Sequence, residues 1–186
     1  AMMLTGQGDD LPVSALPVDG TYPSGTTKYE KRNISDVIAV WDADACIQCG
    51  SCAFVCPHAV LRAKYYPEAA LEGAPVSFQT APLNAAGLPE AQYTLLVYAE
   101  DCTGCGLCVE VCPVKPLGSG ASRKAINLEP TPDRTAQRAN VAFFETIPVN
   151  RRSRVDFANV RGVQYLEPLF EFSGACSGCG ETPYLK

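Results

Sequence analysis

The fold of this chain is decided by residues 46–57, which read CIQCGSCAFVCP. A second copy of the pattern, CTGCGLCVEVCP, occupies residues 102–113. In both copies three cysteines recur at every third position, a fourth follows after three more residues, and a proline comes next. This is the ligand spacing of 4Fe-4S clusters that are held by cysteine thiolates. The sequence therefore predicts two such clusters.

The shape of the cluster explains the spacing. A cubane presents four irons at the corners of a tetrahedron, so a loop with a ligand at every third residue can cover three corners. Small residues have to line such a loop, because the backbone comes close to the sulfides and needs positive φ angles. Short helical turns are expected at residues 53–55 and 109–111, and each is ended by the proline. The small residues in question are Gly50, Ser51, Gly104 and Gly106.

The repeat is similar to that of bacterial two-cluster ferredoxins, in which the fourth cysteine of each motif ligates the cluster of the other motif. We therefore expect a crossed assignment. The first cluster is assigned to Cys46, Cys49, Cys52 and Cys112. The second cluster is assigned to Cys102, Cys105, Cys108 and Cys56.

Two other uses of the cysteines were weighed. Structural zinc also takes tetrahedral thiolate sets, but its usual spacing is a pair, a long gap and another pair. Three ligands within residues 46–52 fit that poorly, and two complete copies favour iron and sulfide. A disulfide framework is weaker still, since cysteines this close would pair only locally and the chain opens with no secretory signal.

Composition limits the remaining possibilities. The 15 glycines and 15 prolines of the 186 residues fit a small domain with long arms. The formal charge is −5, and two clusters would bring it to roughly −9, so nucleic acid is not expected as a partner. The short basic run at Arg151, Arg152 and Arg154 is interpreted as a solvated face or a docking contact. No apolar stretch is long enough for a membrane span, and a cytoplasmic location is expected.

The sequence predicts four segments. Residues 1–35 form an extended arm, and residues 36–130 form the ferredoxin-like domain, of α+β class. Residues 131–172 form a helical linker, and residues 173–186 begin a further domain. Loss of iron is expected to unfold the domain, because metal–ligand bonds replace part of its core.

Within the domain, strands are expected at residues 34–41, 59–66, 93–98 and 126–128, with a short one at 76–79 inside the insert 67–92. Thr131 and Pro132 predict a helix start, with the threonine as N-cap, and Pro148 ends that helix. Trp41 is expected to pack near the first cluster loop. His58, the only histidine, could tune a cluster by hydrogen bonding, although a structural or solvated role is favoured.

The last stretch, residues 170–186, reads FEFSGACSGCGETPYLK. Two cysteines cannot complete a four-ligand site. From their spacing alone, Cys176 and Cys179 fit a redox dithiol, half of a zinc site or half of a further cluster site.

This stretch resembles the start of the thiamine-diphosphate domain of the pyruvate:ferredoxin (or flavodoxin) oxidoreductase family. Residues 19–35, DGTYPSGTTKYEKRNIS, and the two cysteine motifs resemble the same family, so the likeness covers nearly the whole chain. The resemblance implies that Cys176 and Cys179 are ligands of a third 4Fe-4S cluster, whose other two ligands lie further along. It also implies thiamine diphosphate and Mg in the full-length parent.

Members of this family convert pyruvate and coenzyme A to acetyl-CoA and carbon dioxide, and pass electrons singly through three clusters to ferredoxin or flavodoxin. The resemblance implies that this chain is the electron-transfer part of a homodimeric parent. It has no catalytic residues of its own, and its partners are the remaining parent domains and an external ferredoxin or flavodoxin. Two alternatives stay open: a module of another 2-oxoacid oxidoreductase, and a zinc-stabilised interaction module without a redox role.

Overall fold

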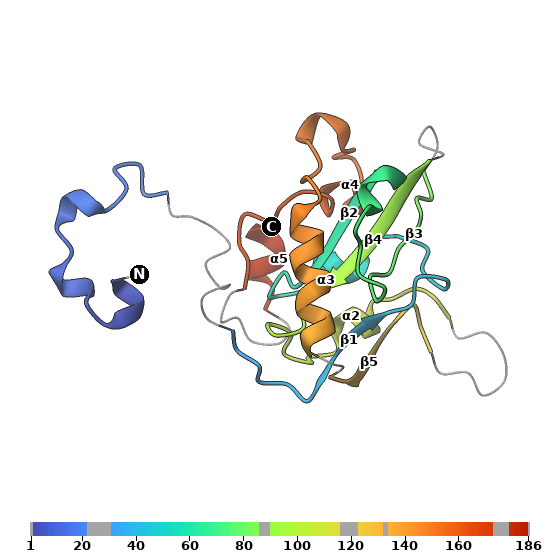
Figure 1. Ribbon diagram of the computed structural model, residues 1–186, viewed down its shortest axis with the longest axis horizontal. Coiled ribbons are helices and arrows are strands. Elements are labelled where there is room, and N and C mark those ends of the chain that lie inside the picture. Colours follow the sequence, from blue (N-terminus) through green and yellow to red (C-terminus); the bar gives the residue numbers. More distant parts are fainter. Residues whose placement is uncertain are drawn as a thin grey trace.

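The computed structural model describes residues 2–21, 31–85, 90–115, 123–131, 134–172 and 179–185. Its body contains two antiparallel sheets (Figure 1). In the first sheet, β1 (Val37–Trp41) pairs with β5 (Ile126–Pro130). In the second, β4 (Ala91–Val97) lies between β2 (Leu61–Pro67) and β3 (Ala81–Pro82).

The strand pairing brings the two cysteine motifs together. β1 precedes the first motif and β5 follows the second, and in their sheet Trp41 lies opposite Ile126. β2 follows the first motif and β4 precedes the second, and in their sheet Leu61 lies opposite Val97. Each sheet therefore joins a strand of one half of the domain to a strand of the other half.

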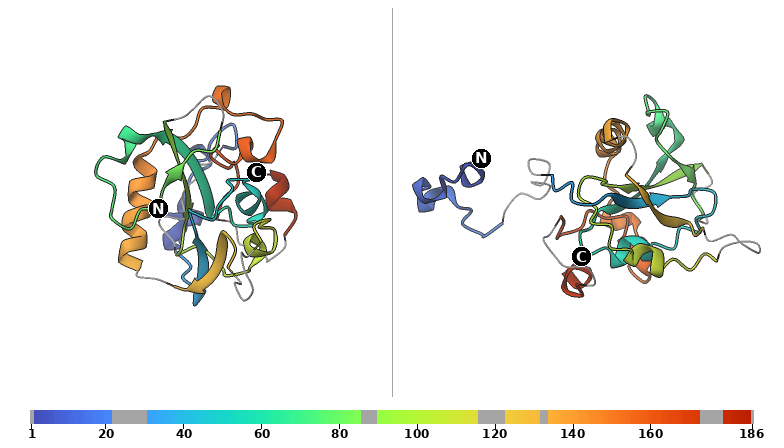
Figure 2. Two further views of the ribbon diagram at one scale, coloured as in Figure 1. Left: turned by 90° about the vertical axis from the view of Figure 1, so that its right-hand side faces the viewer. Right: turned by 90° about the horizontal axis from the view of Figure 1, so that it is seen from below.

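The cysteine motifs and the long helix lie on opposite sides of the sheets. α1 (Ser51–Val55) and α2 (Leu107–Glu110) belong to the motifs and pack against each other. α3 (Arg134–Thr146) covers the other face and contacts β4 (Figure 2). β4 is covered on both faces and paired along both edges, so its run Tyr93–Val97 is buried without the alternation of an exposed strand.

The apolar face of α3 closes the core. Phe144 and Ile147 are buried against the β2–β4 sheet. At the end of this helix the buried Lys64 donates hydrogen bonds from Nζ to the carbonyl oxygens of Phe144, at 2.8 Å, and Ile147. The Phe144 carbonyl lies in the last turn of the helix and also accepts from Ile147 N at 3.2 Å.

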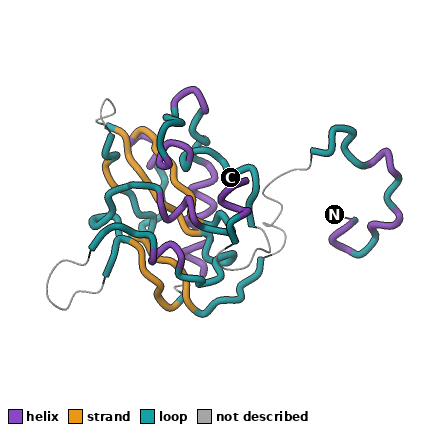
Figure 3. Tube along the Cα trace, turned by 180° about the vertical axis from the view of Figure 1, so that it is seen from behind, coloured by secondary structure: helices purple, strands orange, loops and turns teal. Residues whose placement is uncertain are grey.

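The remaining elements are short. The N-terminal arm carries η1 (Met3–Thr5), η2 (Gly8–Asp10) and η3 (Val13–Ala15), and it lies away from the body (Figures 1 and 3). No residue of η2 or η3 is buried, which agrees with an arm that has no core. The insert contains η5 (Glu68–Leu71), and the C-terminal part contains η6 (Arg152–Arg154), α4 (Val160–Val163) and α5 (Glu181–Leu185).

One local prediction was wrong, and a second lies partly outside the described residues. Residues 76–79 form a turn followed by irregular chain, and Phe78 N donates to Pro75 O at 2.9 Å. The strand of the insert is β3, a few residues later. The long helix begins at Arg134, and the Thr131 hydroxyl donates to the Ser35 carbonyl at 3.2 Å. Thr131 is thereby tied to the segment before β1, and Pro132 lies outside the described residues.

Candidate metal centres

The first candidate site is a small cavity beneath β4. Four thiols line it, together with the side chains of Trp41 and Tyr93. Three of the thiols come from the first motif and one comes from the second. They are Cys46, Cys49, Cys52 and Cys112.

The second candidate site gathers the other four thiols. Burial raises the pKa of Cys108 to about 12, and the nearby thiols of Cys56, Cys102 and Cys105 add to the increase. The pKa of Cys102 is raised by burial as well, and Cys56 and Cys105 again contribute. The fourth cysteine of the first motif therefore lies among the first three cysteines of the second.

The two candidate sites are neighbours. Burial raises the pKa of Cys52, and both Cys46 of its own set and Cys108 of the other set raise it further. α1 carries Cys52, α2 carries Cys108, and the two helices are packed together. The structure thus brings together each of the two expected sets and places them side by side.

A glycine is required in the second loop. Gly104 has φ +65°, and a Cβ built there would lie 2.4 Å from Ser35 Oγ and 2.9 Å from the Val37 carbonyl oxygen. Both distances are shorter than van der Waals contact, and the conformation itself is one that side chains rarely adopt. The loop therefore approaches the start of β1 as closely as backbone atoms allow.

Gln48 occupies the corresponding place in the first loop, and no sequence pattern singles it out. The side chain is 4% exposed, and the residue has φ +57°. Nε2 donates to the Pro82 carbonyl at 2.8 Å, and Oε1 accepts from the Asn84 amide at 2.8 Å. These two hydrogen bonds hold the insert against the first cysteine loop. The structural role of Gln48 is visible only in the structure, where both polar atoms of its buried amide have partners.

The character of the sites fits 4Fe-4S clusters. Burial raises the pKa of Cys46, Cys52, Cys102 and Cys108, so these thiols stay protonated until a metal displaces the proton. Within the described parts of the chain, no three or more His, Cys, Asp or Glu side chains gather closely enough to hold a single metal ion. The four thiols of the first set instead line one cavity, and a cubane with a ligand at each corner requires such an arrangement.

Trp41 adds a polar atom to the first site. Its indole Nε1 is buried and makes no hydrogen bond of ordinary geometry to any described residue. The same N–H lies near enough to the Cys46 thiol to lower its pKa, against the larger effect of burial. The predicted packing of Trp41 beside the first cluster loop is therefore observed.

Residues beyond Cys56 anchor the C-terminal connector. His58 is 3% exposed, so the solvated role considered for it is wrong, and its carbonyl accepts from Phe172 N at 2.8 Å. Arg62 forms an ion pair with Glu171, and the Phe172 ring packs edge-on against Tyr98 with centroids 5.1 Å apart. This connector, residues 164–172, is irregular and is held beside the first motif.

The expected third site is only partly visible. Cys176 lies outside the described residues. Cys179 precedes α5, where hydrogen bonds from the backbone N–H groups of Thr182 and Glu181 lower the pKa of its thiol. The Thr182 hydroxyl also lies 3.9 Å from the Cys179 sulfur.

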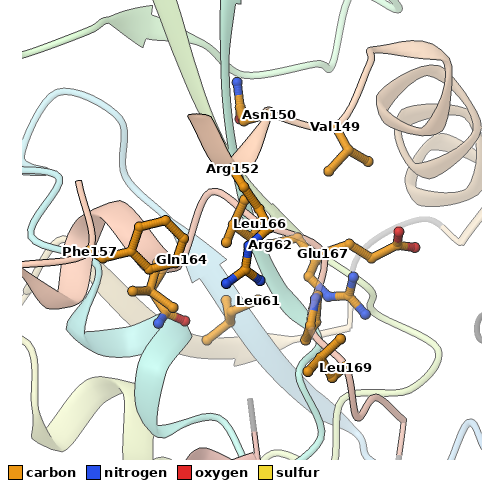
Figure 4. A pocket seen from close by; sticks show the side chains of 12 residues that line it. Leu61, Arg62, Val149, Asn150, Arg152, Phe157, Gln164, Leu166, Glu167 and Leu169 are labelled. Carbon is orange, nitrogen blue, oxygen red and sulfur yellow. The ribbon is translucent and has the colours of Figure 1, made fainter. Parts of the chain in front are cut away.

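A larger cavity, of about 470 Å³, lies between β2 and the connector (Figure 4). Its lining residues include Arg62, Arg152 and Phe157. No cysteine lines this cavity. The Arg152 guanidinium lies 4.9 Å from the centroid of the Phe157 ring. The exposed basic run therefore borders a hollow on the surface and takes no part in the cysteine sites.

Comparison with known proteins defines the class first. Residues 45–115 match the family model of a 4Fe-4S dicluster domain, and residues 1–35 match the EKR domain, a domain of unknown function. The chain thus contains a 4Fe-4S dicluster domain on an α+β ferredoxin-like fold. None of the described helices is both long enough and apolar enough to span a membrane.

The relatives define the family more closely. Across 99% of its length the chain is 54% identical to the pyruvate-flavodoxin oxidoreductase of Trichormus variabilis, and it covers 16% of that protein. Across 97% it is 46% identical to the pyruvate:ferredoxin oxidoreductase of Moorella thermoacetica, and covers 15% of it. Across 97% it is 42% identical to the mitochondrial pyruvate dehydrogenase [NADP(+)] of Euglena gracilis, and covers 9% of it.

Over nearly its whole length the chain is therefore similar to pyruvate-flavodoxin oxidoreductases, as the resemblance predicted. It spans about one sixth of the length of these relatives.

Proposed function

We propose that this chain is the electron-transfer segment of a pyruvate:ferredoxin or pyruvate:flavodoxin oxidoreductase, with two 4Fe-4S clusters bound by the crossed cysteine sets. The observation that carries the proposal is the exchange of fourth ligands. Cys112 of the second motif lines the cavity of Cys46, Cys49 and Cys52, while Cys56 of the first motif lies with the second set. In two-cluster ferredoxins the fourth cysteine of each motif ligates the other cluster, which is the arrangement that these sets match.

When bound, each cluster would accept and release one electron. The residues of the chain hold the ligands in place and exclude water from them. Tyr93 and Leu95 of β4 line the first cavity from the sheet side, and both are buried. The packing of α1 on α2 keeps the two thiol sets adjacent, so that the distance between their redox centres is short.

The rest of the proposed reaction belongs to other parts of a longer protein. Oxidative decarboxylation of pyruvate to acetyl-CoA would take place at thiamine diphosphate and Mg. A third cluster, with Cys176 and Cys179 as two of its ligands, would pass the electrons on. The anchoring of Phe172 and Glu171 beside β2 supports this, because it fixes the start of the tail close to the cysteine sites.

The electron acceptor is proposed to be an external ferredoxin or flavodoxin. The names of the relatives mention flavodoxin, ferredoxin and NADP(+), although this segment is similar in all three. The remaining domains of a homodimeric parent are the other proposed partners. The basic run at Arg151, Arg152 and Arg154, exposed beside a hollow, is a suitable docking contact for them.

Iron and sulfide analysis of the anaerobically purified chain tests the proposal. Two clusters require about eight irons and about eight labile sulfides per chain. Stoichiometric zinc without sulfide would instead show that the chain is a zinc-stabilised module without a redox role. Reduction of the longer protein by pyruvate, compared with reduction by other 2-oxoacids, distinguishes this enzyme from an oxidoreductase of another 2-oxoacid.

A further inference from the structure

The first cysteine site contains a polar group that the ligand pattern does not explain. Trp41 is the only tryptophan of the chain and ends β1. It is 4% exposed, and the Tyr93 ring packs edge-on against it, with centroids 5.7 Å apart and an angle of 71°. The indole ring is therefore held rigidly between the two sheets.

The indole N–H is buried and lies near the Cys46 thiol. Among the described residues it makes no hydrogen bond of ordinary geometry, although buried donors in native proteins nearly always make one. The side chain lines the cavity that is surrounded by Cys46, Cys49, Cys52 and Cys112. A bound group that offers sulfur acceptors in this cavity would supply the missing partner.

We propose that Trp41 Nε1–H donates a hydrogen bond to a sulfur of the first 4Fe-4S cluster and raises the reduction potential of that cluster above that of the second. This inference rests on the proposed function, since it requires the clusters. Reduction adds one electron to the cluster, and no proton has to move. A fixed donor stabilises the more negative reduced form more strongly than the oxidised form, so it raises the potential.

At the corresponding position the second half has no such donor. The motifs begin at Cys46 and Cys102, 56 residues apart, and the same offset places Val97 where the first half has Trp41. The greater solvent exposure of the first set of cysteines also raises the reduction potential of the first cluster relative to the second. All four thiols of the first set are partly exposed, whereas Cys56, Cys102 and Cys108 of the second set are buried. Electrons shared between the two sites should therefore reside mainly on the first.

The test compares the iron-loaded full chain with Trp41→Phe under anaerobic conditions. Hyperfine-shifted NMR signals of the cysteine β-protons report the reduction of each cluster separately, and the second cluster serves as an internal control. We expect the one-electron equilibrium of the first cluster to shift about tenfold towards the oxidised form, which corresponds to about 59 mV. The equilibrium of the second cluster should stay unchanged.

A second variant removes only the donor. Because Trp41 is the sole tryptophan, biosynthetic replacement by β-(3-benzothienyl)alanine exchanges its N–H for sulfur and keeps the bicyclic shape. It should reproduce the shift even where Trp41→Phe loses iron. An unchanged potential of the first cluster with about eight irons retained would overturn the inference, as would equal shifts of both clusters. A chain that binds no iron would overturn the proposed function, and the inference with it.

Discussion

The two cysteine loops have the same ligand spacing but are held in place by different means. Both begin a short helix after a glycine with positive φ, Gly50 at +79° and Gly106 at +82°. Two positions earlier the first loop has Gln48 and the second has Gly104, and both residues are left-handed. Gln48 reaches outward and binds the insert through two hydrogen bonds, whereas Gly104 lies directly against β1.

The flanking segments differ in the same way. In the first half, a Cβ built on Gly50 would lie 3.0 Å from Arg161 Cα of α4. Phe172 N donates a hydrogen bond to the His58 carbonyl. On the second half, Lys124 Nζ donates to the Val109 carbonyl at 2.7 Å and to the Glu110 carbonyl at 3.3 Å, at the end of α2. The ligand pattern is thus repeated, while its support comes from elsewhere in the chain. The two halves can therefore present the same ligand spacing although different residues hold each loop in place.

Loss of a fourth ligand is expected to have the largest effect. Cys112→Ala should empty the site of Cys46, Cys49 and Cys52, and leave the cluster of its own motif, because the fourth ligands are exchanged. Cys56→Ala is the matched variant and should empty the other site. Each variant should lose about four of eight irons. NMR of the cysteine β-protons identifies the cluster that is lost, and loss of the same-motif cluster would show that the assignment is not crossed.

The tail supplies a thiol outside both halves. Cys179 has a lowered pKa because backbone N–H groups donate to it, and its reactive thiolate form is therefore populated more than in an ordinary cysteine. In the iron-loaded chain we expect Cys176 and Cys179 to be alkylated at least about tenfold faster than the eight motif cysteines, which are held by iron. Mass spectrometry after brief anaerobic alkylation measures this. About twelve irons, with both tail thiols protected, would instead mean that a third cluster is shared between chains.

Much of this organisation could be predicted from the sequence, because it depends on local spacing. The cysteine and proline positions specify the two sites, and the alternating residues before and after each motif indicate the four main strands. The insert was not predictable in this way, since Val76 looks like a strand residue and is fully exposed. The hydrogen bonds of Gln48 and of the buried Lys64 join residues that are 34 or more positions apart, which no local pattern reveals. The burial of the Trp41 N–H likewise depends on the packing of the two sheets.

The loop comparison can be sharpened with one substitution in each half. Gly104→Ala places a Cβ against Val37 O and Ser35 Oγ in a left-handed backbone, and should lower the free energy of unfolding by about 1–3 kcal/mol. Gln48→Ala keeps the backbone type and removes two hydrogen bonds, at about 1 kcal/mol each. Anaerobic thermal unfolding measures both losses.

Hydrogen exchange separates the two mechanisms. In Gln48→Ala the Asn84 amide should exchange faster, because its acceptor is removed. In Gly104→Ala that amide should be unaffected. Equal acceleration in both variants would mean that the two loops are supported as one unit.

The smallest expected effect concerns two lysines whose amines donate hydrogen bonds to carbonyl groups at the ends of helices. Lys64, on β2 of the first half, is buried below α3, and burial lowers its pKa from 10.5 to about 8. Lys124, in the second half, is partly exposed and donates to the Val109 carbonyl in α2. Below about pH 8 the Lys64 amine is charged in both the folded and the unfolded chain, and the folded state bears the cost of burying that charge.

Between about pH 8 and 10.5 the unfolded chain binds more protons at Lys64 than the folded chain does, so the free energy of unfolding should rise with pH through this window. Tyrosines with raised pKa, such as Tyr66, act in the opposite sense near the upper end, and a difference measurement is needed to remove their contribution. Subtracting the profile of Lys64→Met from that of the iron-loaded wild-type chain should leave a positive slope above pH 8. A flat Lys64 difference would mean that the carbonyls of Phe144 and Ile147 stabilise the ammonium enough to offset its burial.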